Sequence, residues 1–152
     1  METTETMTEA RTEHLPVEAI DFNPLNPRHF RENDAFEQLT ESIRRMGVLQ
    51  PVVCRPHPTR EGTYELAAGE RRLRASRAAG RETILAIVRE LTDEELVDVM
   101  LAENRDREDL TPMEEAREVQ LLLGREGWTI EDVADKLGET PHWVATRAKL
   151  DN

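Results

Sequence analysis

Two short segments carry the side chains with the clearest chemical potential. Residues 69–80 (GERRLRASRAAG) place four arginines within seven positions, directly after an apolar run at residues 64–68. Guanidinium groups and the unpaired backbone N–H groups at a helix start are common ligands of phosphate. Residues 103–107 (ENRDR) set a carboxylate and a carboxamide beside two more arginines, and such oxygens can hold the divalent cation that accompanies a polyphosphate. Together the segments predict a site for a nucleoside triphosphate.

Each segment also has an ordinary structural explanation. Arginines on a helix can form a solvated surface that pairs with nearby acids, and residues 103–107 can be the frayed polar end of a helix. The position of the arginines favours the phosphate site, because they follow a predicted strand and a glycine, where backbone N–H groups are available. Four close guanidinium groups also repel one another unless an anion lies among them.

The charge of the chain argues against nucleic-acid binding by bulk electrostatics. Its 152 residues carry a net charge of −12. The distribution is uneven, however, because residues 69–90 contain six arginines and three glutamates, whereas residues 91–126 contain four arginines and twelve acids. The basic segment therefore coincides with the predicted phosphate site.

The remaining reactive residues indicate no second site. The single cysteine, Cys54, excludes an internal disulfide and lies in a predicted strand, so we expect it to be a small buried side chain. The four histidines show no metal-ligand spacing. No apolar run approaches the roughly 20 residues of a membrane span, and the acidic N-terminus does not resemble a signal peptide. These features predict a cytoplasmic protein with no membrane partner.

Strands and helices in alternation are expected to position the first segment. Apolar residues at helical spacing predict a helix ending at Met46, begun by Asn33 or Asp34 and terminated by Gly47. A second helix is expected over residues 71–79. Three strands are expected, within residues 48–55, 62–68 and 83–89, the first two joined as a hairpin. Residues 1–14 are polar and aperiodic and predict a disordered tail, followed by a short extended piece over residues 15–22.

Only helices are expected after residue 90. Residues 92–95 (TDEE) and 111–114 (TPME) both fit the capping box, in which a hydroxyl group and a carboxylate satisfy the first backbone N–H groups of a helix. A helix capped by Thr129, a turn at residues 138–140 and a further helix predict a helix-turn-helix. An ordinary corner of two helices is the structural alternative.

The last helix would supply the DNA contacts of a helix-turn-helix. Its candidate DNA-binding side chains are Thr140, His142, Thr146, Arg147 and Lys149. Its expected core residues, with those of the preceding helix, are Val133, Ala134, Leu137, Val144 and Leu150. We expect Trp128 and Trp143 to pack rather than to stack on bases.

Five motifs occur in the order found in ParB-type chromosome and plasmid partition proteins, which the chain resembles over about residues 15–150. They are NPR at 26–28, GVLQP at 47–51, GERR at 69–72, ENRDREDL at 103–110 and TPMEEA at 111–116. The resemblance implies an α+β fold, with a ParB/sulfiredoxin-like nucleotide-binding domain at residues 15–110 and an all-α helix-turn-helix segment at residues 111–152.

The resemblance also implies a function. Members of the family bind CTP with Mg²⁺, close as a dimeric clamp on a palindromic centromere-like DNA site, and hydrolyse CTP slowly to reopen. The chain would then be a nucleotide switch in DNA partition, located in the cytoplasm on the nucleoid or on a plasmid.

Matching positions carry the family's site residues onto this chain. The residues that would hold the phosphates are Gly69, Glu70, Arg71 and Arg72, with Ala75 allowing close helix approach. Those that would serve Mg²⁺ and hydrolysis are Glu103 and Asn104, and Arg107 would contact phosphate or the clamp interface. The loop that reads cytosine would be shaped by Gln50 and Pro51.

Several departures from the family pattern alter these expectations. The chain ends just past the predicted recognition helix, where the family continues with a dimerising domain, so we expect either a piece of a longer protein or a C-terminally short member. The N-terminal tail lacks the basic segment with which family members stimulate a ParA-type ATPase. Arg105 and Asp106 replace apolar and amide residues within the second motif, which could change the hydrolysis rate. Glu70 stands where sulfiredoxins have a reactive cysteine, which argues against sulfiredoxin chemistry.

Two other functions stay open from the sequence. A transcription regulator that ignores nucleotides would use the ParB-like domain only as a scaffold, since a fold does not by itself secure an activity. An enzyme of the same superfamily, such as a phosphotransferase or nuclease, would act on another nucleotide.

Overall fold

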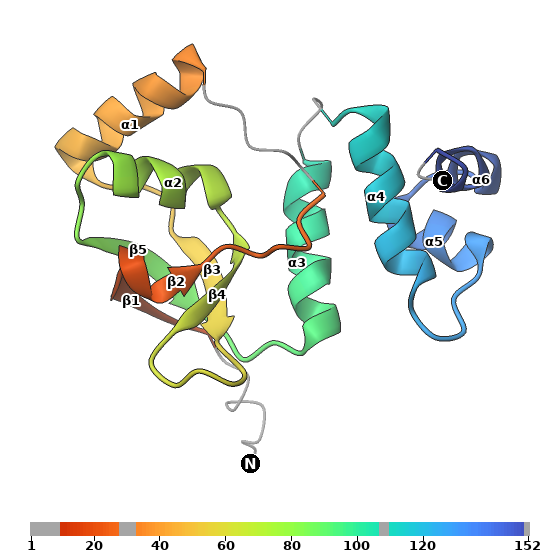
Figure 1. Cartoon of the computed structure of the whole chain (residues 1–152), viewed down its shortest axis with the longest axis horizontal. Coiled ribbons are helices and arrows are strands. Elements are labelled where there is room, and N and C mark those ends of the chain that lie inside the picture. Colours follow the sequence, from red (N-terminus) through yellow and green to blue (C-terminus); the bar gives the residue numbers. More distant parts are fainter. Residues whose placement is uncertain (1–9, 28–32, 107–109, 151–152) are drawn as a thin grey trace. The chain divides into compact units, whose positions relative to one another are not determined.

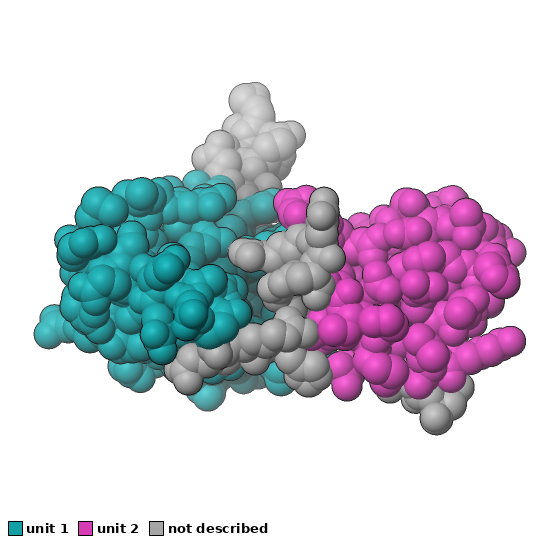
Figure 2. Space-filling view, turned by 90° about the horizontal axis from the view of Figure 1, so that it is seen from above, with its two compact units in different colours: residues 1–26, 30–103 teal, residues 27–29, 104–152 magenta. Residues whose placement is uncertain are grey.

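The computed structural model (Figure 1) describes residues 10–27, 33–106 and 110–150. The chain divides into two compact units, residues 1–26 with 30–103 and residues 27–29 with 104–152 (Figure 2). The boundary thus falls inside α3 (Asp93–Arg105), several residues before the position near Leu110 that the sequence suggested. Local capping signals mark where helices begin, but they do not show with which unit the last turn of a helix packs.

The first unit is built on a five-stranded mixed sheet with the order β1-β5-β3-β4-β2. Its strands are β1 (Arg11–Pro16), β2 (Ile20–Asp21), β3 (Val52–Pro56), β4 (Tyr64–Ala68) and β5 (Thr83–Val88). β1 and β5 pair antiparallel, as do β3 and β4, whereas β3 and β5 pair parallel, as do β2 and β4. The three strands and the hairpin expected from the sequence are confirmed, and so is the α+β fold class.

The sequence predicted strands β1 and β2 only in part, as a short extended piece over residues 15–22. Residues 11–14 belong to β1, so the expectation of a disordered tail over residues 1–14 is wrong for its last four residues; residues 1–9 lie outside the described part. The sequence of β1 shows no alternation of apolar and polar residues, because Leu15 is its only buried side chain. The strand is held by its pairing with β5, from Arg11 opposite Val88 to Pro16 opposite Thr83, and such a distant partner leaves no local pattern.

Two helices cover the sheet in separate layers. α2 (Glu70–Ala78) follows β4 directly and lies over the sheet, and α1 (Asp34–Met46) packs against α2 (Figure 1). Asn33 caps α1 by accepting a hydrogen bond from the N–H of Phe36, and Gly47, at φ 74°, ends it. The predicted caps of α1 are therefore confirmed. A cluster of Phe36, Ile43 and Ala75 joins the two helices.

The second unit contains α4 (Pro112–Leu123), α5 (Ile130–Leu137) and α6 (Pro141–Ala148). The capping boxes predicted at residues 92–95 and 111–114 are present at the starts of α3 and α4. The expected core residues Val133, Ala134 and Val144 are buried. Leu150 is 43% exposed, contrary to expectation, because α6 ends at Ala148 and no longer directs it inward. Within the described ranges, no helix is long and apolar enough to cross a membrane.

Candidate nucleotide-binding site

Gly69 makes the turn between β4 and α2, at a position that admits no side chain. Its φ is 110°, in the left-handed region that favours glycine. A Cβ atom there would lie 2.6 Å from Cγ1 and 2.9 Å from Cβ of Val52 on β3. The backbone therefore lies directly against β3. The Gly69 N–H, at the start of α2, donates a hydrogen bond to Oε1 of Glu103 at 3.1 Å.

Arg72 joins three sequence motifs at one guanidinium group. Its Nη1 donates to the carbonyl oxygens of Gln50 at 3.0 Å and Pro51 at 2.7 Å, and its Nη2 lies 2.9 Å from Oε2 of Glu103. The loop before β3, the start of α2 and the last turn of α3 thus meet around Arg72. The structure thus brings together five of the residues that the sequence assigned to the nucleotide or its Mg²⁺, namely Gln50, Pro51, Gly69, Arg72 and Glu103.

The other arginines of α2 do not form one open cradle. Arg74 donates to Oε2 of Glu70 at 2.9 Å, and its guanidinium lies 4.3 Å from the centre of the Phe22 ring. Arg77 lies 4.8 Å from the same ring and donates to the carbonyl oxygen of Val17 at 2.8 Å. A carboxylate, a carbonyl and an aromatic face thus offset these charges. The anions expected among the four arginines are thus supplied in part by the chain itself, through Glu70 at Arg74 and Glu103 at Arg72.

Three further residues that the motifs assigned to the site, Glu70, Arg71 and Ala75, contact other parts of the first unit. Glu70 accepts a hydrogen bond from Nδ2 of Asn26 at 3.2 Å. The guanidinium of Arg71 lies 5.7 Å from the Phe36 ring centre. Ala75 is fully buried, so its methyl group serves the close approach of α1 and α2 rather than direct contact with a ligand.

The second motif is divided between the two units. Glu103 belongs to the first unit, whereas Asn104 is 3% exposed and belongs to the second; Arg107 lies outside the described residues. Among the residues that the structure describes, no group of three or more histidine, cysteine, aspartate or glutamate side chains could hold a metal ion. Mg²⁺ bound with a nucleotide needs few protein carboxylates, since phosphate and water complete its shell. Glu103 alone could therefore supply the protein's share.

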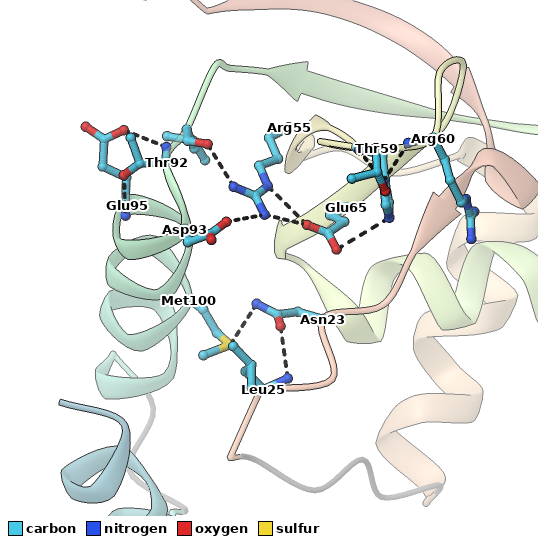
Figure 3. A network of polar contacts seen from close by, with 12 residues as sticks. Asn23, Leu25, Arg55, Thr59, Arg60, Glu65, Thr92, Asp93, Glu95 and Met100 are labelled. Carbon is cyan, nitrogen blue, oxygen red and sulfur yellow. Dashed lines mark hydrogen bonds and ion pairs between the residues drawn. The ribbon is translucent and has the colours of Figure 1, made fainter. Parts of the chain in front are cut away.

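A second set of contacts attaches α3 to the sheet (Figure 3). No sequence motif predicted them. Arg55 on β3 is 7% exposed; its Nη2 lies 2.7 Å from Oε1 of Glu65 on β4 and 2.9 Å from Oδ1 of Asp93 at the start of α3. Farther along α3, Sδ of Met100 accepts a hydrogen bond from Nδ2 of Asn23 at 3.4 Å. α3 is thus attached to the rest of the first unit at positions other than Glu103.

Cys54 behaves as the sequence predicted. It is buried on β3, and burial raises the pKa of its thiol to about 12. A thiol with such a pKa stays protonated near neutral pH and is a poor nucleophile.

In the second unit, the two candidate DNA-binding threonines form hydrogen bonds with the backbone of α6. The hydroxyl group of Thr140 caps α6 by accepting from the N–H of Trp143 at 3.1 Å. The hydroxyl group of Thr146 donates to the carbonyl oxygen of His142 at 2.9 Å. Thr140 therefore serves as the N-cap of α6.

The other candidates on α6 differ in their surroundings. Arg147 lies 3.2 Å from Oε1 of Glu115 and 4.1 Å from the centre of the Trp143 ring, so it takes part in the packing of α6 on α4. His142 and Lys149 are exposed. These two side chains are the ones best placed to reach a partner without first breaking a contact that the structure shows.

Arg105 organises the second unit, although the sequence marked it only as a departure from the motif. Its guanidinium forms an ion pair with Glu139, lies 3.6 Å from Oε1 of Glu118, and lies 5.4 Å from the Trp143 ring centre. It also donates to the carbonyl oxygen of Leu137 at 3.4 Å. One side chain thus contacts α4, α6, the end of α5 and the turn between α5 and α6.

Comparison with known proteins identifies the family of the chain. The ParB N-terminal domain model matches residues 1–105, more than half of the sequence. The chain belongs to the ParB family. A probable chromosome-partitioning protein ParB of Pseudomonas putida is 44% identical over 138 residues, which cover 91% of this chain and 47% of that protein. The chain thus spans about half the length of this curated ParB relative.

Two solved ParB structures, both of C-terminally truncated Caulobacter crescentus protein, resemble the chain. The first is complexed with CTP-gamma-S; it is 37% identical, with a TM-score of 0.59, and the match covers 90% of this chain and 76% of that one. The second is complexed to the centromeric parS site; it is 35% identical, with a TM-score of 0.64, covering 89% and 69%. The recognition of a ParB-type fold from the five motifs is confirmed.

Proposed function

We propose that this chain is the nucleotide-binding and DNA-binding part of a partition protein, acting as a CTP-controlled clamp on a palindromic, centromere-like site. The observation that carries the proposal is the meeting of residues 50–51, Gly69 and Glu103 around Arg72. These groups lie far apart in sequence and together offer what a nucleoside triphosphate requires. A related structure with a bound CTP analogue supports the choice of nucleotide.

Each group would have a separate task. The Gly69 N–H and the Arg72 guanidinium would bind phosphate oxygens, the first through the partial positive charge at the start of α2. Arg71, on the same turn, would assist. The loop at Gln50 and Pro51 would face the base. Residues 50–51 are held by Arg72 through their carbonyl groups, so the phosphate ligand also positions the proposed base-reading loop.

Glu103 would serve Mg²⁺ and slow hydrolysis. A bound Mg²⁺ would offset the negative charge of the phosphates. The carboxylate of Glu103 could in addition orient the attacking water by accepting a hydrogen bond. The burial of Asn104 gives it a lesser part in the proposed site than its place in the motif suggested.

DNA binding would fall to α5 and α6 as a helix-turn-helix. His142 and Lys149 are exposed on or beside α6, and α6 would enter the major groove. Because the net charge of the chain is −12, we expect a few placed contacts to bind DNA rather than a broad basic surface. A palindromic site requires two copies of the reading helix, so the clamp would be a dimer. The related complex with parS DNA supports this role.

Calorimetric titration with CTP, ATP, GTP and UTP, each with and without Mg²⁺, tests the proposal. We expect Mg²⁺-dependent binding of CTP in preference to the other three. An absence of binding to all four nucleotides, with the helical circular dichroism signal intact, would refute the nucleotide switch.

One observation favours a second function, a DNA-binding regulator that does not use nucleotides. The Gly69 N–H and Arg72 Nη2 are satisfied by Glu103 of the chain itself, as a purely structural domain would require. A footprint on a palindromic site that is identical with and without CTP would support this regulator instead.

A further inference from the structure

The carboxylate of Glu103 occupies the groups to which the proposed function assigns a phosphate. Its Oε1 accepts from the Gly69 N–H at 3.1 Å, and its Oε2 lies 2.9 Å from Arg72 Nη2. The two oxygens of one anion thus bind two separate donors, a backbone amide at a helix start and a guanidinium. Both donors are of the kinds that recognise phosphate.

A carboxylate and a phosphate compete for such donors because both present anionic oxygens to the same hydrogen atoms. A backbone N–H that already donates to a carboxylate must leave it before donating to phosphate in the same direction. Two anions side by side would also repel each other, unless a cation lies between them.

We infer that Glu103 is an internal occupant of the phosphate site, and that a nucleotide binds by displacing its carboxylate. The inference rests on the proposed function and adds a regulation to it. Glu103 would hold the empty site in an ordered, charge-balanced state. Once released, the same carboxylate becomes available to bind Mg²⁺. Without a metal, Glu103 would therefore only compete with the nucleotide and weaken its binding. With Mg²⁺ present, the released carboxylate would contribute to binding through the metal.

Contacts other than those of Glu103 also hold Arg72 and α3. Arg72 is held by the carbonyl oxygens of Gln50 and Pro51. α3 is fastened by the contact of Asp93 with Arg55. Removal of Glu103 should therefore leave the phosphate donors in position and unoccupied. If Glu103 were instead needed to position Arg72, its removal would weaken phosphate binding, so the two roles predict opposite signs.

The test measures metal-free binding by calorimetry in EDTA, with inorganic triphosphate and with CTP as probes. We expect Glu103→Ala to bind both probes about tenfold more tightly than the unaltered chain, which is about 1.4 kcal/mol, a size in keeping with a partly exposed ion pair. Glu103→Gln, which keeps an oxygen acceptor but loses the charge, should show a smaller gain. With Mg²⁺ present, the advantage of Glu103→Ala should shrink or reverse.

Glu41→Ala is the matched control, because it removes the same charge from an exposed position on α1. Its affinities should equal those of the unaltered chain. An equal gain in Glu41→Ala would overturn the inference in favour of a general charge effect, and so would unchanged or weaker triphosphate binding by Glu103→Ala.

Hydrogen exchange at the Gly69 amide gives a measurement that needs no ligand. The amide should be protected in the unaltered chain and should exchange faster in Glu103→Ala, while amides of β3 keep their protection. Equal protection in both proteins would overturn the inference. Failure of the unaltered chain and of Glu103→Ala alike to bind CTP with Mg²⁺ would refute the proposed function. CTP binding with Mg²⁺ but no metal-free gain in Glu103→Ala would refute the inference alone.

Discussion

Arg105 is the cation that approaches the buried carboxylate of Glu118, with Nη1 lying 3.6 Å from Oε1. That distance is too long for a hydrogen bond, and neither oxygen of Glu118 has a hydrogen-bond partner among the described residues. Glu118 is fully buried on α4. Burial raises the pKa of its carboxyl group to about 7, although the charge of Arg105 acts in the opposite direction. The second unit therefore contains a carboxyl group that titrates near neutral pH.

This carboxyl group predicts that the second unit loses stability as the pH rises from about 4.5 to above 7. Between these values the folded unit holds a proton that the unfolded chain has released, so raising the pH favours unfolding. The rise in the pKa of Glu118 from its ordinary value to about 7 corresponds to at most roughly 3 kcal/mol. Glu118→Gln should remove most of this dependence and stabilise the unit at pH 8. Glu131→Gln, exposed on α5, is the control.

Tryptophan fluorescence during urea unfolding can check this prediction. Both tryptophans of the chain, Trp128 and Trp143, lie in the second unit, so the signal reports on that unit alone. The same pH dependence in Glu118→Gln and in the unaltered chain would contradict the assignment.

Arg105→Ala should destabilise the second unit by about 2–4 kcal/mol at pH 8, because it leaves a buried carboxylate without its cation. The loss should be smaller at pH 5, where Glu118 is protonated and needs no counter-charge. Arg125→Ala offers a matched control, since Arg125 also lies over a tryptophan ring, 5.0 Å from the centre of Trp128. An Arg105→Ala loss that is equal at both pH values would show that the contacts with Trp143 and Glu139 dominate instead.

Gly69→Ala should cost about 2–5 kcal/mol in the stability of the first unit, through a strained backbone and a clash with Val52. Gly80→Ala is the comparison, because Gly80 also has a positive φ, 81°, but nothing lies within 4 Å of a Cβ there. Thermal unfolding followed by circular dichroism measures both. In the double variant with Val52→Ala, the two effects should be less than additive. Full additivity would mean that the clash is not what destabilises Gly69→Ala.

Arg72→Ala should weaken CTP binding by more than about hundredfold, because it removes the proposed phosphate ligand and releases the carbonyl groups of Gln50 and Pro51. Arg72→Lys should recover only part of the affinity, since one ammonium group cannot replace a guanidinium that bonds in several directions. Arg74→Ala, on the same helix and paired with Glu70, should change the affinity only a few-fold. Calorimetry decides, and equal losses in Arg72→Ala and Arg74→Ala would count against the proposed site.

Lys149→Ala should reduce DNA affinity and lower the slope of log K against log salt by about one, as expected for one lost phosphate contact. The other lysine of the chain, Lys136 on α5, provides the control, and Lys136→Ala should leave the slope nearly unchanged. Fluorescence anisotropy at several salt concentrations measures both variants. Equal slopes for Lys149→Ala and the unaltered chain would exclude Lys149 from the interface.

The features that the sequence determined by itself were of two kinds: helix ends set by neighbouring residues, and motifs shared with a family. The cap of α1 at Asn33, its end at Gly47 and the capping box of α4 depend on residues within one turn of each other, so a few positions suffice to predict them. The five motifs identified the ParB family, and they assigned Gly69, Arg72 and Glu103 to the candidate site from the sequence alone.

The tertiary structure alone decided which of these groups act together. β1 pairs with β5, Arg55 forms an ion pair with Asp93, and Arg105 lies beside the carboxylate of Glu118. The arginines of α2 looked equivalent in sequence, yet Arg74 and Arg77 flank Phe22, whereas Arg72 contacts Glu103. Such pairs join residues that lie at least 13 positions apart, and periodicity and capping carry no signal about them. They form only when the sheet and helices are assembled, so the contact of Glu103 with Gly69 and Arg72 could be found only in the folded chain.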